Sequence, residues 1–198
     1  MARPRAFDID TALDAAMNVF WRKGYEGASL NDLLDAMQIA RGSLYKAFAD
    51  KRSIYLAALD HYDRTIVGPG IAMLGDPRHG DGIVRVKRLL NASADALAQQ
   101  GDRRGCFICN AAVDRAPHDH EVEAKVKAML GRIEDGIDLA LADAEATRRW
   151  PSQQRRAAAR ALTTSYMGLR VMAKAGYDAR GLREIINTTL ASLELLPA

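Results

Sequence analysis

The sequence predicts an all-α protein, and two observations carry this prediction. Apolar residues recur at helical spacing along almost the whole chain, and no stretch shows the strict alternation of a strand. Helix-ending signals such as Gly24, Gly101 and Pro117 divide the chain into about nine helices. We expect an N-terminal unit of three helices in residues 1–52 and a larger helical unit in residues 53–198.

Length and composition describe an ordinary globular chain. Its 198 residues are 48% apolar and 27% charged, and a net charge of +3 does not by itself indicate a nucleic-acid partner. No apolar run is long enough to cross a bilayer, and the first eight residues lack the apolar stretch of a secretory signal. Two cysteines do not make a disulfide framework. We therefore expect a cytoplasmic protein without a membrane partner.

The first two helices of the N-terminal unit are amphipathic. The first has a stripe of apolar residues that ends before Gly24: Ile9, Leu13, Ala16, Met17 and Phe20. The second begins at Ser29, where Asp32 stands in the position that completes a capping box. A third segment, from Ile39 to Lys51, follows after a tight turn.

This third segment is the most informative part of the chain. Its predicted apolar underside consists of Leu44, Ala47 and Phe48. Its predicted outer face consists of Arg41, Ser43, Tyr45 and Lys46. Two short helices joined by a turn, with donors exposed on the second, form a helix-turn-helix that fits the major groove of DNA.

These residues resemble a known family. The match consists of Phe20, Gly24, Ser29, Ile39, Leu44, Tyr45, Phe48 and Lys51, and it resembles the TetR family of bacterial transcriptional regulators. The segment from Arg104 to Pro117 also resembles a pattern in one branch of that family. The resemblance implies a homodimeric, sequence-specific DNA-binding regulator. The simplest such regulator is a repressor bound to a palindromic operator. A small-molecule inducer binds in the second unit and releases the repressor from that operator.

Two positions depart from the family pattern. Gln38 occupies the turn where members commonly have Gly, and a positive φ there would cost on the order of 1 kcal/mol relative to Gly. Ala40 starts the third helix where members often have Ser or Thr, and Ala is a poor N-cap.

The predicted DNA contacts follow from position and from the resemblance. They are Arg3, Arg5, Ser29, Arg41, Gly42, Ser43, Tyr45, Lys46 and Lys51. Arg41 is expected either to pair with guanine or to remain a solvated or phosphate-contacting residue. By the resemblance, Tyr45 and Lys51 bind phosphates, although Tyr45 could instead be half-buried. Arg3 and Arg5 form either a minor-groove arm or a disordered terminus.

Cys106 and Cys109 form a lone Cys-x-x-Cys with several interpretations. A zinc site would need His118 and His120 as further ligands. A sensor thiolate is favoured by a helix start that follows Arg103 and Arg104, whereas free cysteines on helices are usually small core residues. The alternative function is therefore a DNA-binding thiol, electrophile or metal sensor. A dithiol enzyme is a weaker alternative, because the βαβ surroundings of a thioredoxin-type couple are absent and no catalytic constellation can be named. A further alternative is a helical interaction protein without DNA binding. We expect no catalytic residues, no cofactor and no resident metal.

The larger unit is expected to hold a helix over residues 51–67 that ends at Gly68-Pro69-Gly70, and a long helix from Val122 to about Arg149. The predicted ligand pocket consists of Cys106, Phe107, Cys109, Met129, Ile133, Tyr166, Arg170 and Lys174. The predicted dimer interface lies on the last two helices and consists of Ala161, Ser165, Gly168, Leu169, Ile186, Leu190 and Leu193.

Overall fold

The computed structural model describes residues 8–100 and 104–194, and every regular element in these ranges is helical. The prediction of an all-α fold is confirmed, with ten α-helices in the described ranges where the sequence predicted about nine. The helices are α1 (Ile9–Gly27), α2 (Leu30–Met37), α3 (Arg41–Ala47), α4 (Lys51–Tyr62), α5 (Gly68–Gly75), α6 (Gly82–Gln100), α7 (Phe107–Asp114), α8 (His120–Asp143), α9 (Ser152–Ala175) and α10 (Ala179–Glu194). Among the described residues no helix is both long and apolar enough to cross a membrane.

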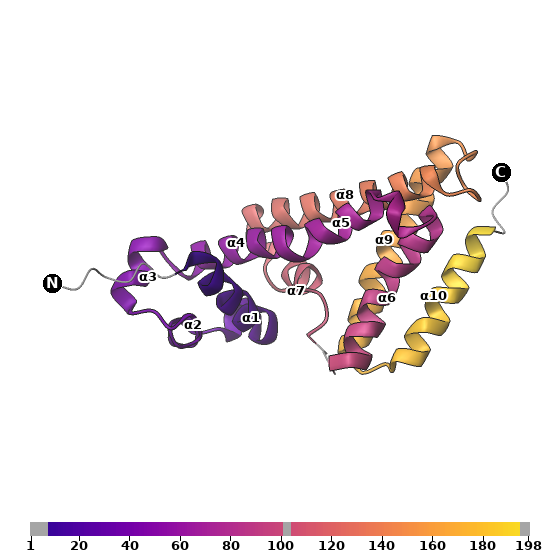
Figure 1. Cartoon of the computed structure of the whole chain (residues 1–198). Coiled ribbons are helices and arrows are strands. Elements are labelled where there is room, and N and C mark those ends of the chain that lie inside the picture. Colours follow the sequence, from indigo (N-terminus) through magenta and orange to yellow (C-terminus); the bar gives the residue numbers. More distant parts are fainter. Residues whose placement is uncertain (1–7, 101–103, 195–198) are drawn as a thin grey trace.

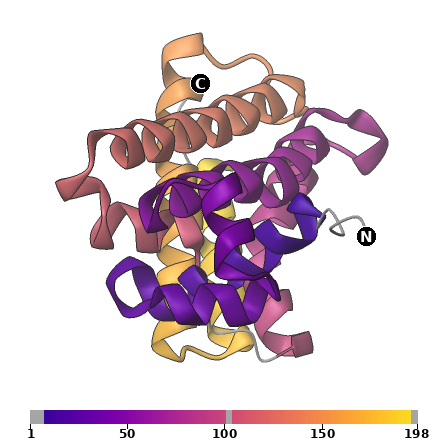
Figure 2. The same cartoon turned by 90° about the vertical axis from the view of Figure 1, so that its left-hand side faces the viewer.

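Figure 1 shows α1, α2 and α3 together at one end of the molecule, and we call these three helices the head. At the other end α6, α9 and α10 lie side by side. The helices α4, α5 and α8 run between the two ends, and α8 lies along α5 (Figure 2). We call the described chain from α4 to α10 the body.

The core of the head is small and well buried. Phe20, Leu33 and Leu44, one from each helix, have no exposed surface. Phe20 also meets Tyr55 of α4 edge to face, with ring centroids 4.9 Å apart. Because α4 thus packs directly on α1, the head is continuous with the body.

The predicted helix end at Gly68-Pro69-Gly70 is wrong, because the helical path continues to Gly75. Between α4 and α5 lies a π-helical turn, η1 (Asp63–Val67), in which the Gly68 N–H bonds to the Asp63 carbonyl. This turn places Pro69 in the first turn of α5, where a missing N–H costs little.

The predicted end of the long helix at about Arg149 is also wrong, since α8 ends at Asp143. Residues 144–150 form turns instead. The Thr147 hydroxyl donates to the Leu141 carbonyl at 2.6 Å and so satisfies an acceptor that the helix end leaves open. Pro151 then precedes α9 as its N-cap residue.

Candidate DNA-binding surface and sensor region

The start of α2 and the turn between α2 and α3 contain local features that the sequence predicted. Ser29 Oγ accepts from the Asp32 N–H at 3.1 Å, and Asp32 Oδ2 accepts from the Ser29 N–H at 2.9 Å, so the capping box is confirmed. Gln38 has φ 53° and occupies the left-handed region, and Ala40 caps α3 without a side-chain hydrogen bond. The turn therefore holds Gln38 in a strained backbone conformation.

The two faces of α3 differ sharply in exposure. Leu44 is fully buried and Phe48 is 8% exposed, whereas Tyr45 is 51% exposed. Arg41, Gly42 and Lys46 are exposed beside it, and Ser43 is half-buried. The predicted outer face is thus confirmed as a surface, and the half-buried alternative for Tyr45 is wrong.

Ala47 corrects the predicted underside, because it is exposed. With only seven residues, α3 buries one narrow stripe, and Leu44 together with the following Phe48 fills it. Gly42 has open space around it, since a Cβ added there would meet nothing within 4 Å.

Several predicted DNA contacts already have partners within the protein. Arg41 Nη2 donates to Asn31 Oδ1 at 3.3 Å, so this side chain leans back toward α2. Lys51 Nζ lies 4.5 Å from the centre of the Tyr25 ring. Ser29 gives its hydroxyl proton to Asp32 at 2.8 Å, which places a carboxylate where a phosphate would have to approach. Arg3 and Arg5 lie outside the described residues.

Polar contacts that sequence reasoning missed tie α4 to the start of α8 and join the head to the body. Arg52 Nε and Nη2 pair with the two carboxylate oxygens of Asp119 at 2.7 and 2.8 Å. This guanidinium holds the pKa of the Asp119 carboxyl well below its usual range. The Tyr25 N–H donates to Asp114 Oδ2 at 2.6 Å, which ties the end of α1 to the end of α7. No sequence signal could have paired groups so far apart in the chain.

His61 forms a second link that was not predicted. It is 3% exposed, its Nε2 lies 2.6 Å from Asp14 Oδ1 of α1, and its Nδ1 lies 2.9 Å from Arg64 Nη2. Helix α4 is therefore tied to α1 by a partly buried polar contact just before η1 begins.

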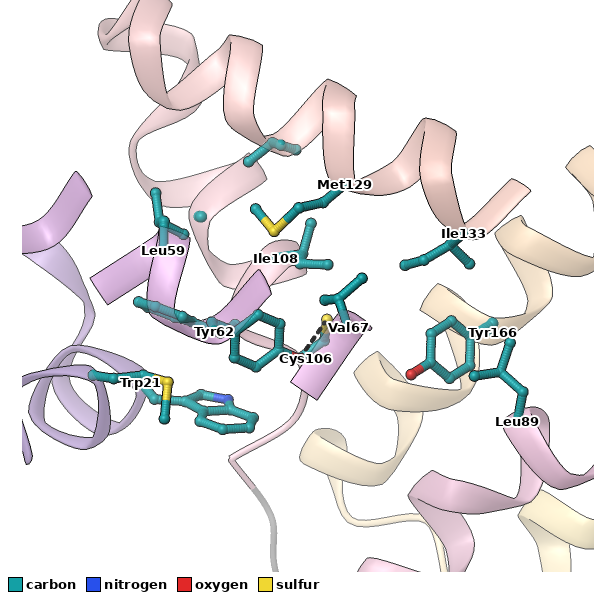
Figure 3. Packing of buried hydrophobic residues seen from close by; sticks show 14 of the residues in the cluster. Trp21, Leu59, Tyr62, Val67, Leu89, Cys106, Ile108, Met129, Ile133 and Tyr166 are labelled. Atoms are coloured by element: carbon teal, nitrogen blue, oxygen red, sulfur yellow. Dashed lines mark hydrogen bonds between the residues drawn. The ribbon is translucent and has the colours of Figure 1, made fainter. Parts of the chain in front are cut away.

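The cysteines lie at the start of α7. Cys106 is the N-cap residue and is 2% exposed, and its Sγ lies 3.8 Å from the Tyr62 hydroxyl (Figure 3). A hydrogen bond from the Cys109 thiol and the positive charge of Arg170 lower the pKa of Cys106 to about 6, against the opposing effect of burial. The same hydrogen bond and burial raise the pKa of Cys109.

Other interpretations of the Cys-x-x-Cys find less support. Within the described ranges no three His, Cys, Asp or Glu side chains are grouped to hold a metal ion, and His118 and His120 are exposed. The helical surroundings also differ from the βαβ setting of a thioredoxin-type dithiol.

The predicted pocket residues are divided among three hollows. Cys106, Ile133 and Tyr166 line a cavity of about 20 Å³, which has room for about one water molecule. Cys109 and Lys174 line a groove of about 390 Å³ between α1, α7 and α9.

Arg170 lines a third hollow, of about 190 Å³. Phe107 and Met129 line none of these three, and their place in a pocket stays a prediction. Phe107 packs instead in an aromatic cluster, with its ring centroid 5.5 Å from that of Tyr62. Sequence position alone could not tell a lining residue from a core residue.

The predicted dimer residues also divide into two groups. Leu169, Ile186, Leu190 and Leu193 are each 9% exposed or less within the single chain. The prediction is corrected for these four, because their side chains pack inside the protomer and present no open apolar face. Ala161 and Gly168 are exposed on α9, with Ser165 half-buried.

Comparison with known proteins identifies one family. The model for "Bacterial regulatory proteins, tetR family" matches residues 12–58, which cover most of α1 through most of α4. The solved structure of a cysteine mutant of the TetR family regulator CifR, in complex with a 26-base-pair operator DNA, is 32% identical to this chain. It superimposes with a TM-score of 0.82, and the match covers 96% of this chain and 99% of that one.

Two relatives from bacteria match over nearly the whole length. The uncharacterized HTH-type transcriptional regulator YezE of Bacillus subtilis (strain 168) is 29% identical, over 98% of this chain and all of the relative. The HTH-type transcriptional repressor ComR of Escherichia coli (strain K12) is 27% identical, over 95% of this chain and 90% of its own. The similarity thus extends from the head through the body, and these relatives are transcriptional regulators.

Proposed function

Because the chain belongs to the TetR family of bacterial transcriptional regulators, we propose that it is a homodimeric repressor that binds a palindromic operator and is released by a small-molecule inducer. The observation that carries this proposal is the geometry of α3. This helix exposes Arg41, Tyr45 and Lys46 above a buried Leu44, and Ser29 and Asp32 cap the helix before it.

The proposed division of labour follows the two faces of α3 and its neighbours. Arg41 reaches a base edge after leaving Asn31, while Tyr45, Lys46 and Lys51 contact phosphates. Gly42 and Ser43 lie against the wall of the DNA major groove. We do not retain Ser29, because its hydroxyl serves the capping box. The DNA-binding unit extends through residue 52, and residues 53–198 carry regulation and dimerisation.

Dimerisation is proposed through the exposed face of α9. Ala161 and Gly168 are small enough for a partner helix to approach closely. Two copies of α3 must then be held about 34–36 Å apart to enter successive major grooves on one side of the duplex.

The test is to mix the pure protein with the DNA upstream of its own gene at two salt concentrations. Specific binding that weakens steeply with salt is expected, since each phosphate contact releases counterions. Lys46→Ala should reduce the salt slope by about 1. Binding with no sequence preference and no change of slope in this variant would contradict the proposal.

A second candidate function, a DNA-binding thiol sensor, is favoured by one observation. Cys106 lines the 20 Å³ cavity with its Sγ 3.8 Å from the Tyr62 hydroxyl, and a hydrogen bond from Cys109 lowers its pKa. Hydrogen peroxide is a suitable probe, because it is little larger than water. The thiolate attacks one peroxide oxygen, the O–O bond breaks and hydroxide leaves, which gives a sulfenic acid. Peroxide should release the operator from the wild type but not from Cys106→Ser, which should still bind DNA. Equal release from both proteins would exclude Cys106 as a sensor.

A further inference from the structure

The hollow of about 190 Å³ lies where the head meets the body. Its wall contains Trp21 of α1, Ile66 of η1, and Arg170 of α9. Arg104, which precedes α7, completes the polar side of the wall. Gly105 and small apolar side chains from α6 and α9 form the remainder, the latter being Ala92, Ala96 and Ala173. Since one water needs about 10–15 Å³ measured in this way, the hollow has room for a small organic molecule.

Two hydrogen-bond donors at this hollow have no acceptor. Trp21 is 6% exposed, and its Nε1 is buried without a hydrogen-bond partner among the described groups. The Nε of Arg170 is buried without a partner in the same way. A buried N–H without an acceptor is unfavourable, and native proteins rarely leave one unless a ligand or water serves it. Both donors belong to residues that line one hollow.

The charge of the wall indicates the sign of a ligand. Among the described residues that line the hollow there are two arginines and no carboxylate. The Arg104 guanidinium lies 4.2 Å from the centre of the Trp21 ring, and Arg170 donates to the Tyr166 hydroxyl at 2.6 Å. Arg170 carries its positive charge on the same side chain whose Nε has no acceptor. The site therefore favours an anion.

We propose that this hollow binds a small organic carboxylate, whose acid group accepts hydrogen bonds from Trp21 Nε1 and Arg170 Nε. The alanines of α6 and α9 contact its apolar part. This inference rests on the proposed function, because it gives the chemical class of the inducer. Trp21 belongs to the head and Arg170 to the body, so one ligand holds both and can change how they are placed relative to one another.

Isothermal titration calorimetry with sodium benzoate and sodium hexanoate tests the site. Benzyl alcohol and hexan-1-ol serve as neutral controls of similar size. We expect saturable binding of at least one acid and at least about tenfold weaker binding of its alcohol, since charge-assisted hydrogen bonds are roughly twice as strong as neutral ones. Absence of saturable binding of both acids up to about 10 mM would overturn the proposal.

Two variants locate the binding. Trp21→Phe keeps an aromatic ring but removes the N–H, and Arg170→Met keeps most of the volume but removes the donor and the charge. Each should weaken acid binding by about 10- to 100-fold, because each removes a hydrogen bond to a charged group. Arg180→Met, at an exposed residue of α10 that pairs with Glu184, is the matched control and should bind the acid like the wild type.

Thermal melting shows whether the variants are folded. If both site variants are folded and bind the acid as tightly as the wild type, the acid binds elsewhere and the proposed site is refuted. Operator binding is measured separately, without acid. If the wild type fails to bind DNA, the proposed function is wrong. The calorimetry tests acid binding at the hollow independently of that result.

Discussion

The exposed face of α3 and the surroundings of Cys106 differ in the solvent exposure of their polar side chains. On α3 the polar side chains project into solvent from a helix whose other side is buried, and Tyr45 is 51% exposed. Around Cys106 the polar groups are themselves buried, with Tyr62 1% and Tyr166 7% exposed. The first region can change its side chains without loss of folding, whereas in the second a change of chemistry is also a change of packing.

The largest expected effect is a loss of stability when a residue on the buried face of α3 is truncated, compared with a residue on its exposed face. Leu44→Ala should lower the free energy of unfolding by about 2–5 kcal/mol, because it empties a fully buried position. Tyr45→Ala should change that free energy by only about 0.5 kcal/mol and yet weaken operator binding. Urea denaturation and fluorescence anisotropy with labelled operator measure the two quantities. Equal destabilisation by both changes would remove the distinction between the faces.

The next effect concerns the specificity of α3. Arg41→Ala should cost about 1–3 kcal/mol of operator binding, since a bidentate arginine–guanine pair contributes that much discrimination. The loss should be small on unrelated DNA of the same length. Arg180→Ala, at an exposed residue of α10, is the control. A similar loss on both DNAs would assign Arg41 to the phosphates.

A smaller loss of stability is expected when a side chain is added at Gly24, where the head meets the body. Gly24 has φ 73°, and an added Cβ would lie 3.1 Å from Asp114 Oδ2. Gly24→Ala should therefore lower the free energy of unfolding by about 1 kcal/mol or more. Gly131→Ala, in the exposed face of α8 with nothing within 4 Å of its Cβ, is the matched control and should be neutral or stabilising. If both variants melt alike, the junction tolerates a side chain at Gly24.

The last effect is a change in how stability depends on pH, and it is expected from the ionisation of Cys106. Folding lowers its pKa from 9.0 to about 6, so its contribution to stability is fully present above the unfolded pKa and is lost as pH falls through about 6. Wild type should therefore gain stability relative to Cys106→Ser as pH rises from 6 to 9. The raised pKa of Cys109 acts in the opposite direction above that range. Parallel stability curves for the two proteins would show that Cys106 does not ionise in the fold.

The head was predicted from sequence more completely than the body, for a physical reason. Its capping box, its turn and its exposed face depend on residues close together in the chain, such as Ser29 and Asp32. In the body, the pairs Arg52–Asp119 and Tyr62–Cys106 join residues far apart. The predicted dimer leucines show the same limit, since helical spacing marks an apolar face without showing what covers it.

The sequence by itself determined the all-α class, the capping of α2 and the outer face of α3, because local hydrogen bonds and helical periodicity decide these features. Only the tertiary structure decided that α4 continues through a π turn into α5 and that Leu169 faces inward. It alone brought Trp21 and Arg170 to one hollow. These outcomes depend on which helix faces meet, and that is set by packing among segments distant in the chain.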